Sequence, residues 1–161
     1  MPTVIEVPAN LIAPEHRLAF KPASPSWDHA VVSGEVDFVN SAPLSVEGEN
    51  DDDLTEYEIH MVVGPWWRDV RVCVPFVTIA GHLNTNSDED DQQMWIVRDL
   101  KWTTDGEGAP NPGEVRIRLE FKVGLQGEHS WLRQLSYYFT AAGRELGLGG
   151  ITKPGPIKTG P

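Results

Sequence analysis

The sequence contains a single cysteine, Cys73, among its 161 residues. One cysteine cannot form a disulfide within the chain, and it cannot supply a cysteine-based zinc site. A chain of this length can bury a core large enough to fold without either kind of cross-link. We therefore expect one domain in which Cys73 is a plain thiol within a strand.

Long apolar runs and an excess of positive charge are also missing. No apolar run reaches the roughly 18 residues of a membrane-spanning helix, and the stretch from Met1 to Val4 lacks the basic and apolar segments of a secretory signal. The 13 lysines and arginines stand against 24 aspartates and glutamates, so the formal net charge is −11. This charge repels phosphate backbones and anionic membranes. We expect a protein that is cytoplasmic, or part of a particle assembled in the cytoplasm, with neither nucleic-acid nor membrane partners.

Sequence motifs for catalysis and cofactor binding are missing as well. The five histidines are scattered, with no His-x-His pair and no His-Glu-x-x-His motif for a zinc or iron site. The Gly-x-Ser-x-Gly nucleophile motif is absent, and Cys73 has no activating neighbour in the sequence. We therefore expect a protein that is not an enzyme and needs no cofactor. A small β-barrel enzyme with a site built from dispersed residues is one alternative.

The clearest pattern in the chain is a strict alternation from Glu114 to Val123. Apolar side chains occupy every second position, and charged side chains occupy the positions between them: Val115, Ile117, Leu119, Phe121 and Val123 against Arg116, Arg118, Glu120 and Lys122. A period of two predicts a strand with one buried face and one face in water. Pro112-Gly113 and Gly124 bound this strand.

Several other segments show the pattern of a strand. Alternation runs from Ala30 to Phe38 and from Tyr57 to Val63, after which Gly64-Pro65 predicts a turn. Next, three valines alternate with three other residues, namely Val70, Val72 and Val74 with Asp69, Arg71 and Cys73. This run continues past Pro75, which marks an edge, a bulge or a break into two strands.

Two further segments are less regular. Met94 to Trp102 is apolar on both sides, which is typical of a strand covered on both faces. Trp131 to Leu146 has both helical and strand spacings, and the aromatic residues of its centre favour a strand.

The proline distribution divides the chain into three parts. Five prolines between residues 1 and 29 predict an extended amino-terminal arm, which lies along its own domain or reaches over a neighbouring subunit. Residues 30–146 form the folded domain, and the Gly/Pro-rich residues 147–161 form a carboxy-terminal tail. Six to eight strands without helical crossovers predict an antiparallel β-sandwich of the jelly-roll or immunoglobulin-like kind, with a flattened β-barrel as the alternative.

Acidic residues are concentrated in two loops, residues 41–53 and 84–93. If residues 66–83 form one strand and neighbouring strands alternate in direction, both loops emerge at the same end, opposite residues 103–113. If Pro75 splits that strand into two of opposite direction, the two loops lie apart. Carboxylates on such loops can bind calcium. The candidates are Asp51, Asp53, Asp88 and Asp90, with Asp52 and Asp91 beside them. The sequence lacks the Asp-x-Asp-x-Asp-Gly loop, so solvated acidic loops are the default interpretation.

Six tryptophans are the other feature of note, and Trp66 and Trp67 are adjacent. Successive strand residues face opposite sides, so both can be buried only if both faces are covered. One ring is expected in the core, and the other packs beneath the arm or offers a surface for a sugar or a protein. Trp95, in the segment that is apolar on both sides, is a third candidate for partner binding.

Three functional hypotheses follow from these features. The first is a non-catalytic structural subunit that packs with neighbours through its arms and exposed aromatic residues, as in a virion or another particle. The second is a carbohydrate- or ligand-binding module that uses Trp66 and Trp67, with or without calcium. The third is the small enzyme described above. The first hypothesis implies protein partners, by self-assembly or in a larger complex.

Overall fold

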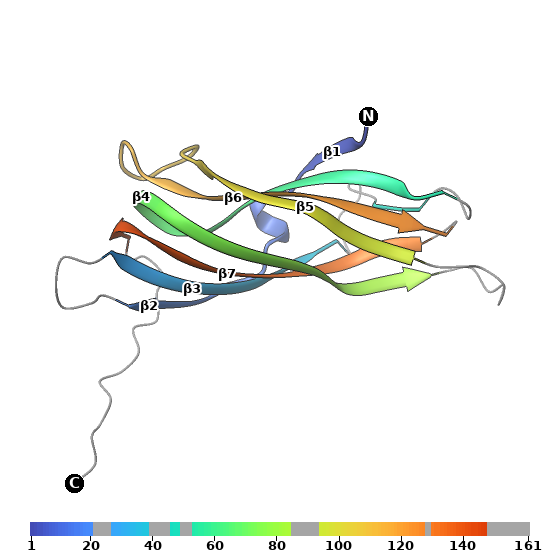
Figure 1. The fold of residues 1–161 in the computed structure, drawn as a ribbon, viewed down its shortest axis with the longest axis horizontal. Helices are drawn as coiled ribbons and strands as arrows, with labels where there is room; N and C mark the ends of the chain where they lie inside the picture. The colour runs from blue at the N-terminus through green and yellow to red at the C-terminus, as the bar shows by residue number, and fades with distance from the viewer. Residues whose placement is uncertain (21–26, 39–45, 49–52, 85–93, 128–129, 148–161) are drawn as a thin grey trace, which may run out of the picture.

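The structure is a computed structural model that describes residues 1–20, 27–38, 46–48, 53–84, 94–127 and 130–147. Seven strands form one antiparallel sheet that is not closed (Figure 1). They are β1 (Thr3–Glu6), β2 (His16–Phe20), β3 (Asp28–Asp37), β4 (Thr55–Asn84), β5 (Met94–Asp105), β6 (Val115–Gln126) and β7 (Ser130–Leu146). The predicted antiparallel β-class is therefore confirmed, and so is the choice of a strand for residues 131–146.

The described residues contain one helical element, the short 3-10 turn at Ala9–Leu11. None of their helices is long and apolar enough to cross a bilayer.

The 30-residue strand β4 reverses direction at the predicted Gly64-Pro65 turn. Its first half pairs antiparallel with β6, from Thr55 opposite Leu125 to Trp67 opposite Val115. Its second half pairs antiparallel with β7 and returns to Asn84, which lies opposite Ser130. The sheet is thereby folded at this corner (Figure 1). One side, here called the β6 half, holds β1, the first half of β4, β6 and β5; the β7 half holds the second half of β4, β7, β3 and β2.

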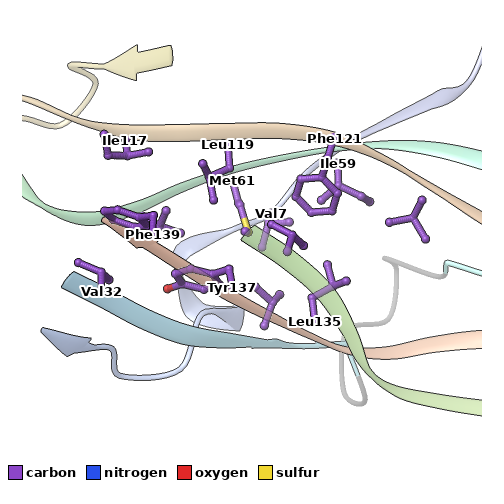
Figure 2. Close-up of a cluster of buried hydrophobic side chains, with 14 of the residues drawn as sticks. Val7, Val32, Ile59, Met61, Ile117, Leu119, Phe121, Leu135, Tyr137 and Phe139 are labelled. Carbon is purple, nitrogen blue, oxygen red and sulfur yellow. The ribbon is translucent and has the colours of Figure 1, made fainter. Parts of the chain in front are cut away.

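The inner faces of the two halves form the hydrophobic core. Side chains of β6 and β7, among them Leu119, Phe121, Leu135 and Phe139, point toward one another across it (Figure 2). All four are at most 1% exposed. The alternation of the β6 sequence is confirmed, since Ile117 through Val123 bury every second side chain. Burial of this apolar surface is the main force that closes the fold.

Both strands of the amino-terminal arm pair within their own chain. β1 runs parallel to the first half of β4, with Ile5 opposite Ile59, and β2 runs antiparallel to β3. The arm thus extends from the β6 half to the β7 half by way of the 3-10 turn. The placement of Val7 in the core shows how this crossing is anchored (Figure 2).

The strand ends agree with the predicted arrangement of the loops. β4 both begins and ends near the turn between β6 and β7, since Thr55 lies opposite Leu125 and Asn84 opposite Ser130. β5 ends at the other end of the sheet, where Asp105 lies opposite Arg116. The second half of β4 passes through Pro75 without a break, and in the described part of the chain it pairs on one side, with β7. Pro75 therefore marks an edge strand, where a missing backbone donor is tolerated.

The second half of β4 differs from its predicted pattern in one respect. The valines at positions 72 and 74 point outward and are 47% and 61% exposed, whereas Cys73 and Val77 are buried in the core. A register shift between Val70 and Val72 inserts an extra residue into β4. Such a bulge exchanges the two faces of a strand from that point on. The apolar side of this strand is consequently in contact with solvent.

Candidate functional site

The two adjacent tryptophans do not form a common platform at the surface. Trp67 is 0% exposed and belongs to the core. Trp66 is partly buried, and the Arg116 guanidinium lies over its ring, 5.5 Å from the ring centroid. This arrangement agrees with the expectation that one of the two adjacent tryptophans lies in the core and the other outside it. Because Trp67 is enclosed, it cannot present its ring to a ligand as the pair hypothesis requires.

Trp95 lies near the start of β5, which among the described strands pairs with β6 alone and so stands at an edge of the sheet. Its side chain is 47% exposed, and its neighbours Met94 and Ile96 are 50% and 38% exposed. The residues that the structure describes do not cover this segment on both faces, as the sequence had led us to expect. These three residues form a short exposed apolar strip at the edge of the β6 half.

The calcium candidates fall mainly outside the described residues. Asp51, Asp88 and Asp90 are not described, and nor are Asp52 and Asp91. Asp53 is described, and it is exposed just before β4 begins.

A charged cluster lies on the outer face of the β6 half. His60 on β4 contacts Glu6 of β1 through Nδ1 at 2.8 Å and Glu58 through Nε2 at 2.9 Å. Arg118 of β6 donates to Glu6 at 2.6 Å and to Glu120 at 3.0 Å, and Lys101 of β5 pairs with Glu120 at 2.9 Å. Side chains from four strands thus meet in one ionic network, here called the His60 cluster.

The protonation of the His60 cluster follows from these contacts. Burial acts to lower the pKa of His60, but the hydrogen bonds to Glu58 and Glu6 outweigh it and raise this pKa. Burial likewise opposes ionisation of Glu6, and the hydrogen bonds from Arg118 and His60 outweigh it, so the pKa of Glu6 is lowered. The cluster is therefore a set of matched charges that ties β1 to β4 and β6.

Glu58, His60 and Glu120 offer donor atoms within 4.8 Å of one another, a separation that could suit a metal ion. A metal there would have to replace Arg118 and Lys101 at Glu120, and it would have to bind a histidine whose neighbours favour its protonated form. The chemistry of the cluster consequently favours ion pairing over metal binding.

The outer face of the β7 half carries most of the exposed apolar side chains. Cross-strand pairing arranges its outward residues in three rows over β2, β3, β7 and β4: Phe20, His29, Ala142 and Val72; Leu18, Val31, Thr140 and Val74; His16, Ser33, Tyr138 and Phe76. None of these residues is an aspartate, glutamate, lysine or arginine. We call these three rows, together with Trp27 just before β3, the apolar outer face.

The apolar outer face is both exposed and uneven. Seven of its side chains are between 38% and 61% exposed: Leu18, Phe20, Trp27, Val72, Val74, Phe76 and Tyr138. A hollow lies over the first row, where Val72 and Ala142 are small and Phe20 and Trp27 form the rim. Phe76 and Tyr138 in the third row are 60% and 44% exposed, and they line a second hollow. A surface of this kind can bind another apolar protein surface.

Sequence reasoning missed the apolar outer face. The signal was present, because the run from Val72 to Ile79 is apolar at both odd and even positions, apart from Thr78. The same double-sided pattern in residues 94–102 led to the prediction of a strand covered on both faces. For β4 the prediction used only the alternation of Val70, Val72 and Val74 with Asp69, Arg71 and Cys73.

Comparisons with known proteins give no further assignment: no family model matches the chain, and no curated protein or solved structure matches it significantly.

Proposed function

We propose that this chain is a non-catalytic structural subunit that assembles with protein neighbours through its apolar outer face. The observation that carries the proposal is the exposure of the seven apolar side chains on four adjacent strands, without an intervening charge. Single exposed apolar residues are common on soluble proteins, but contiguous patches mark interaction sites.

The size of the patch supports an interface. With about 150–250 Å² for each aromatic side chain, the exposed parts of these seven residues amount to roughly 600 Å². A standard interface covers about 800 Å² of each partner, of which a little more than half is apolar. Covering roughly 600 Å² at about 25 cal/mol per Å² is favourable by on the order of 15 kcal/mol, which is comparable to the cost of association.

Two other features agree with assembly. Among the described residues, the second half of β4 and β5 are each hydrogen-bonded to one neighbouring strand, and both carry exposed apolar side chains. Trp95 keeps its proposed role as a partner contact at the β5 edge. We interpret the folded sheet as a β-sandwich. A subunit of this fold would suit a virion or another particle, at a position where the negatively charged chain does not contact nucleic acid.

Light scattering during size-exclusion chromatography tests the proposal. From about 10 µM to about 1 mM, the mass of the purified protein should rise above that of one chain by mass action. Val74→Asp should return the mass to that of one chain, because it buries a carboxylate in the interface. Val4→Asp is the matched control, since Val4 is 52% exposed on β1, away from the face. A protein that stays monomeric throughout, or that loses association equally with both variants, would overturn the proposal.

A further inference from the structure

We infer that the neighbour on the apolar outer face is a second copy of this chain, docked about a twofold axis that crosses the strands at the level of Val74 and Thr140. The inference rests on the proposed function and adds to it the identity and the orientation of the partner. It follows from the arrangement of shape and charge on either side of that level.

The shape of the face is complementary to itself. The first and third rows lie at equal distances on either side of the middle row, because Ala142 and Tyr138 are each two residues from Thr140 on β7. A twofold axis across the strands places the first row of one copy on the third row of the other. Phe76 then sits over the partner's Val72, and Tyr138 sits over the partner's Ala142. The large exposed side chains of the third row of each copy are thereby placed over the first-row hollow of the other.

The charges beyond the three rows have opposite signs at the two ends. Arg144 lies four residues after Thr140 on β7. On the other side of Thr140, Ser136 lies four residues before it on β7, and Glu35 of β3 lies opposite Ser136. Each end is thus about 14 Å from the central row at about 3.4 Å per residue. Both Arg144 and Glu35 are exposed. Near Arg144, Arg71 and Asp69 form an ion pair with each other at 2.7 Å, and Asp28 accepts a hydrogen bond from the backbone N–H of Leu146.

These charges select one orientation of the second copy. An axis across the strands reverses the strand direction, so Arg144 approaches Glu35 of the partner subunit, one strand spacing or about 5 Å to the side. The contact occurs twice in a closed isologous dimer. An axis along the strands would instead bring the two Glu35 ends together. That arrangement is disfavoured by like-charge repulsion in a chain whose net charge is already −11.

The area of the face is also sufficient for a dimer. An isologous interface uses the same patch on both copies, so roughly 600 Å² of apolar surface per copy exceeds the roughly 450 Å² that is apolar in a standard interface. The three central rows carry no carboxylate, and a second acidic copy therefore meets the least repulsion there.

Charge exchange tests the orientation in the full-length protein. Glu35→Arg alone and Arg144→Glu alone should each raise the dissociation constant at least about tenfold, because each places like charges together twice. The double variant should restore the dissociation constant to within about threefold of the wild-type value. Sedimentation equilibrium gives these constants. If Val74→Asp abolishes association but the charge variants have wild-type affinity, this inference is wrong and the proposed function stands.

A disulfide test examines the axis directly. Residues on the axis meet their own counterparts, so Val74→Cys should form a disulfide-linked dimer under mild oxidation, whereas Val4→Cys should not. The native thiol does not interfere, because burial raises the pKa of Cys73 to about 12. Equal cross-linking of both variants would overturn the inference. So would association that begins only after removal of residues 148–161, since that segment of the same chain would then be the occupant of the face.

Discussion

Glu15 accepts a hydrogen bond from the backbone N–H of Gly64, 2.8 Å away and 49 residues further along the chain. The same carboxylate oxygen accepts from the Tyr137 hydroxyl, and the other oxygen accepts from Arg17. The Glu15 side chain is only 3% exposed. One carboxylate of the amino-terminal arm thus fixes the corner at which β4 reverses. Burial, followed by the negative charge of Glu15, raises the pKa of Tyr137, which keeps this hydroxyl a donor.

Replacing this carboxylate should destabilise the fold strongly. Glu15→Ala removes the acceptor of the Gly64 N–H and of the Tyr137 hydroxyl, and it removes the carboxylate that pairs with Arg17. Breaking a buried charge pair in this way costs about 3–5 kcal/mol. Urea unfolding measures the loss. Glu107→Ala, at an exposed position, should change the free energy of unfolding by less than about 0.5 kcal/mol. Equal effects of the two substitutions would show that Glu15 does not hold the corner.

Gly64 itself should not tolerate a side chain. Its φ is +80°, and a Cβ atom there would lie 2.6 Å from the ring of Phe139. Gly108 has a similar φ of +71° but open space around it. Gly108→Ala should therefore lower the free energy of unfolding by only about 1–2 kcal/mol, the strain of a left-handed alanine. Gly64→Ala should lower it clearly more, because its Cβ also meets the ring. Thermal unfolding of both variants checks this order. If the corner were loosely packed, the two substitutions would lower the melting temperature equally.

Phe121 tests the core side of β6. It is 1% exposed, so Phe121→Ala should reduce the free energy of unfolding by about 3–5 kcal/mol through the cavity it leaves. Lys122→Ala, on the opposite face of the same strand, removes an ion pair with Asp99 and should cost less than about 1 kcal/mol. A loss below about 1 kcal/mol for Phe121→Ala would mean that the faces of this strand are inverted.

The His60 cluster should make stability depend on pH. Because the folded-state pKa of His60 is raised, its contribution is complete below the ordinary value of 6.5 and is lost as the pH rises through the folded-state pKa. Because the pKa of Glu6 is lowered, its contribution is present above the ordinary value of 4.5 and is lost as the pH falls through the folded-state pKa. The cluster should therefore stabilise the fold most between these two values.

Urea unfolding of wild type and His60→Gln as a function of pH measures this effect. The difference in the free energy of unfolding should be largest near pH 5–6 and should shrink toward pH 8. Glu6→Gln should reduce the pH dependence without removing it, since Glu58 still contacts His60. A difference that grows with pH would contradict the assigned charge state of the cluster.

Sequence periodicity predicted those strands whose two faces differ in polarity. In β6 the charged residues had to face water, so the burial of Phe121 followed directly. In β4 the residues after Val70 are apolar on both sides, and a bulge that the sequence does not mark decided that Val74 points outward. Alternation predicted that Trp66 and Trp67 differ in burial, but the choice between them depends on how the corner packs.

The network around Glu15 could not be predicted at all from local patterns. Glu15 and Tyr137 are 122 residues apart, and they meet only because β2, β3 and β7 are neighbours in the folded sheet. The His60 cluster has the same origin, since its members come from β1, β4, β5 and β6. Contacts of this kind arise from strand order, which periodicity does not specify.

The apolar outer face can be located directly by hydroxyl-radical footprinting of the full-length protein at low and high concentration. Oxidation of Phe76 and Tyr138 should fall several-fold as the concentration rises, because a neighbour covers both side chains in the associated state. Met1, which is fully exposed, provides the internal reference and should keep its rate. If Phe76 and Tyr138 are oxidised equally at both concentrations while the protein associates, the subunits meet elsewhere and the central claim is wrong.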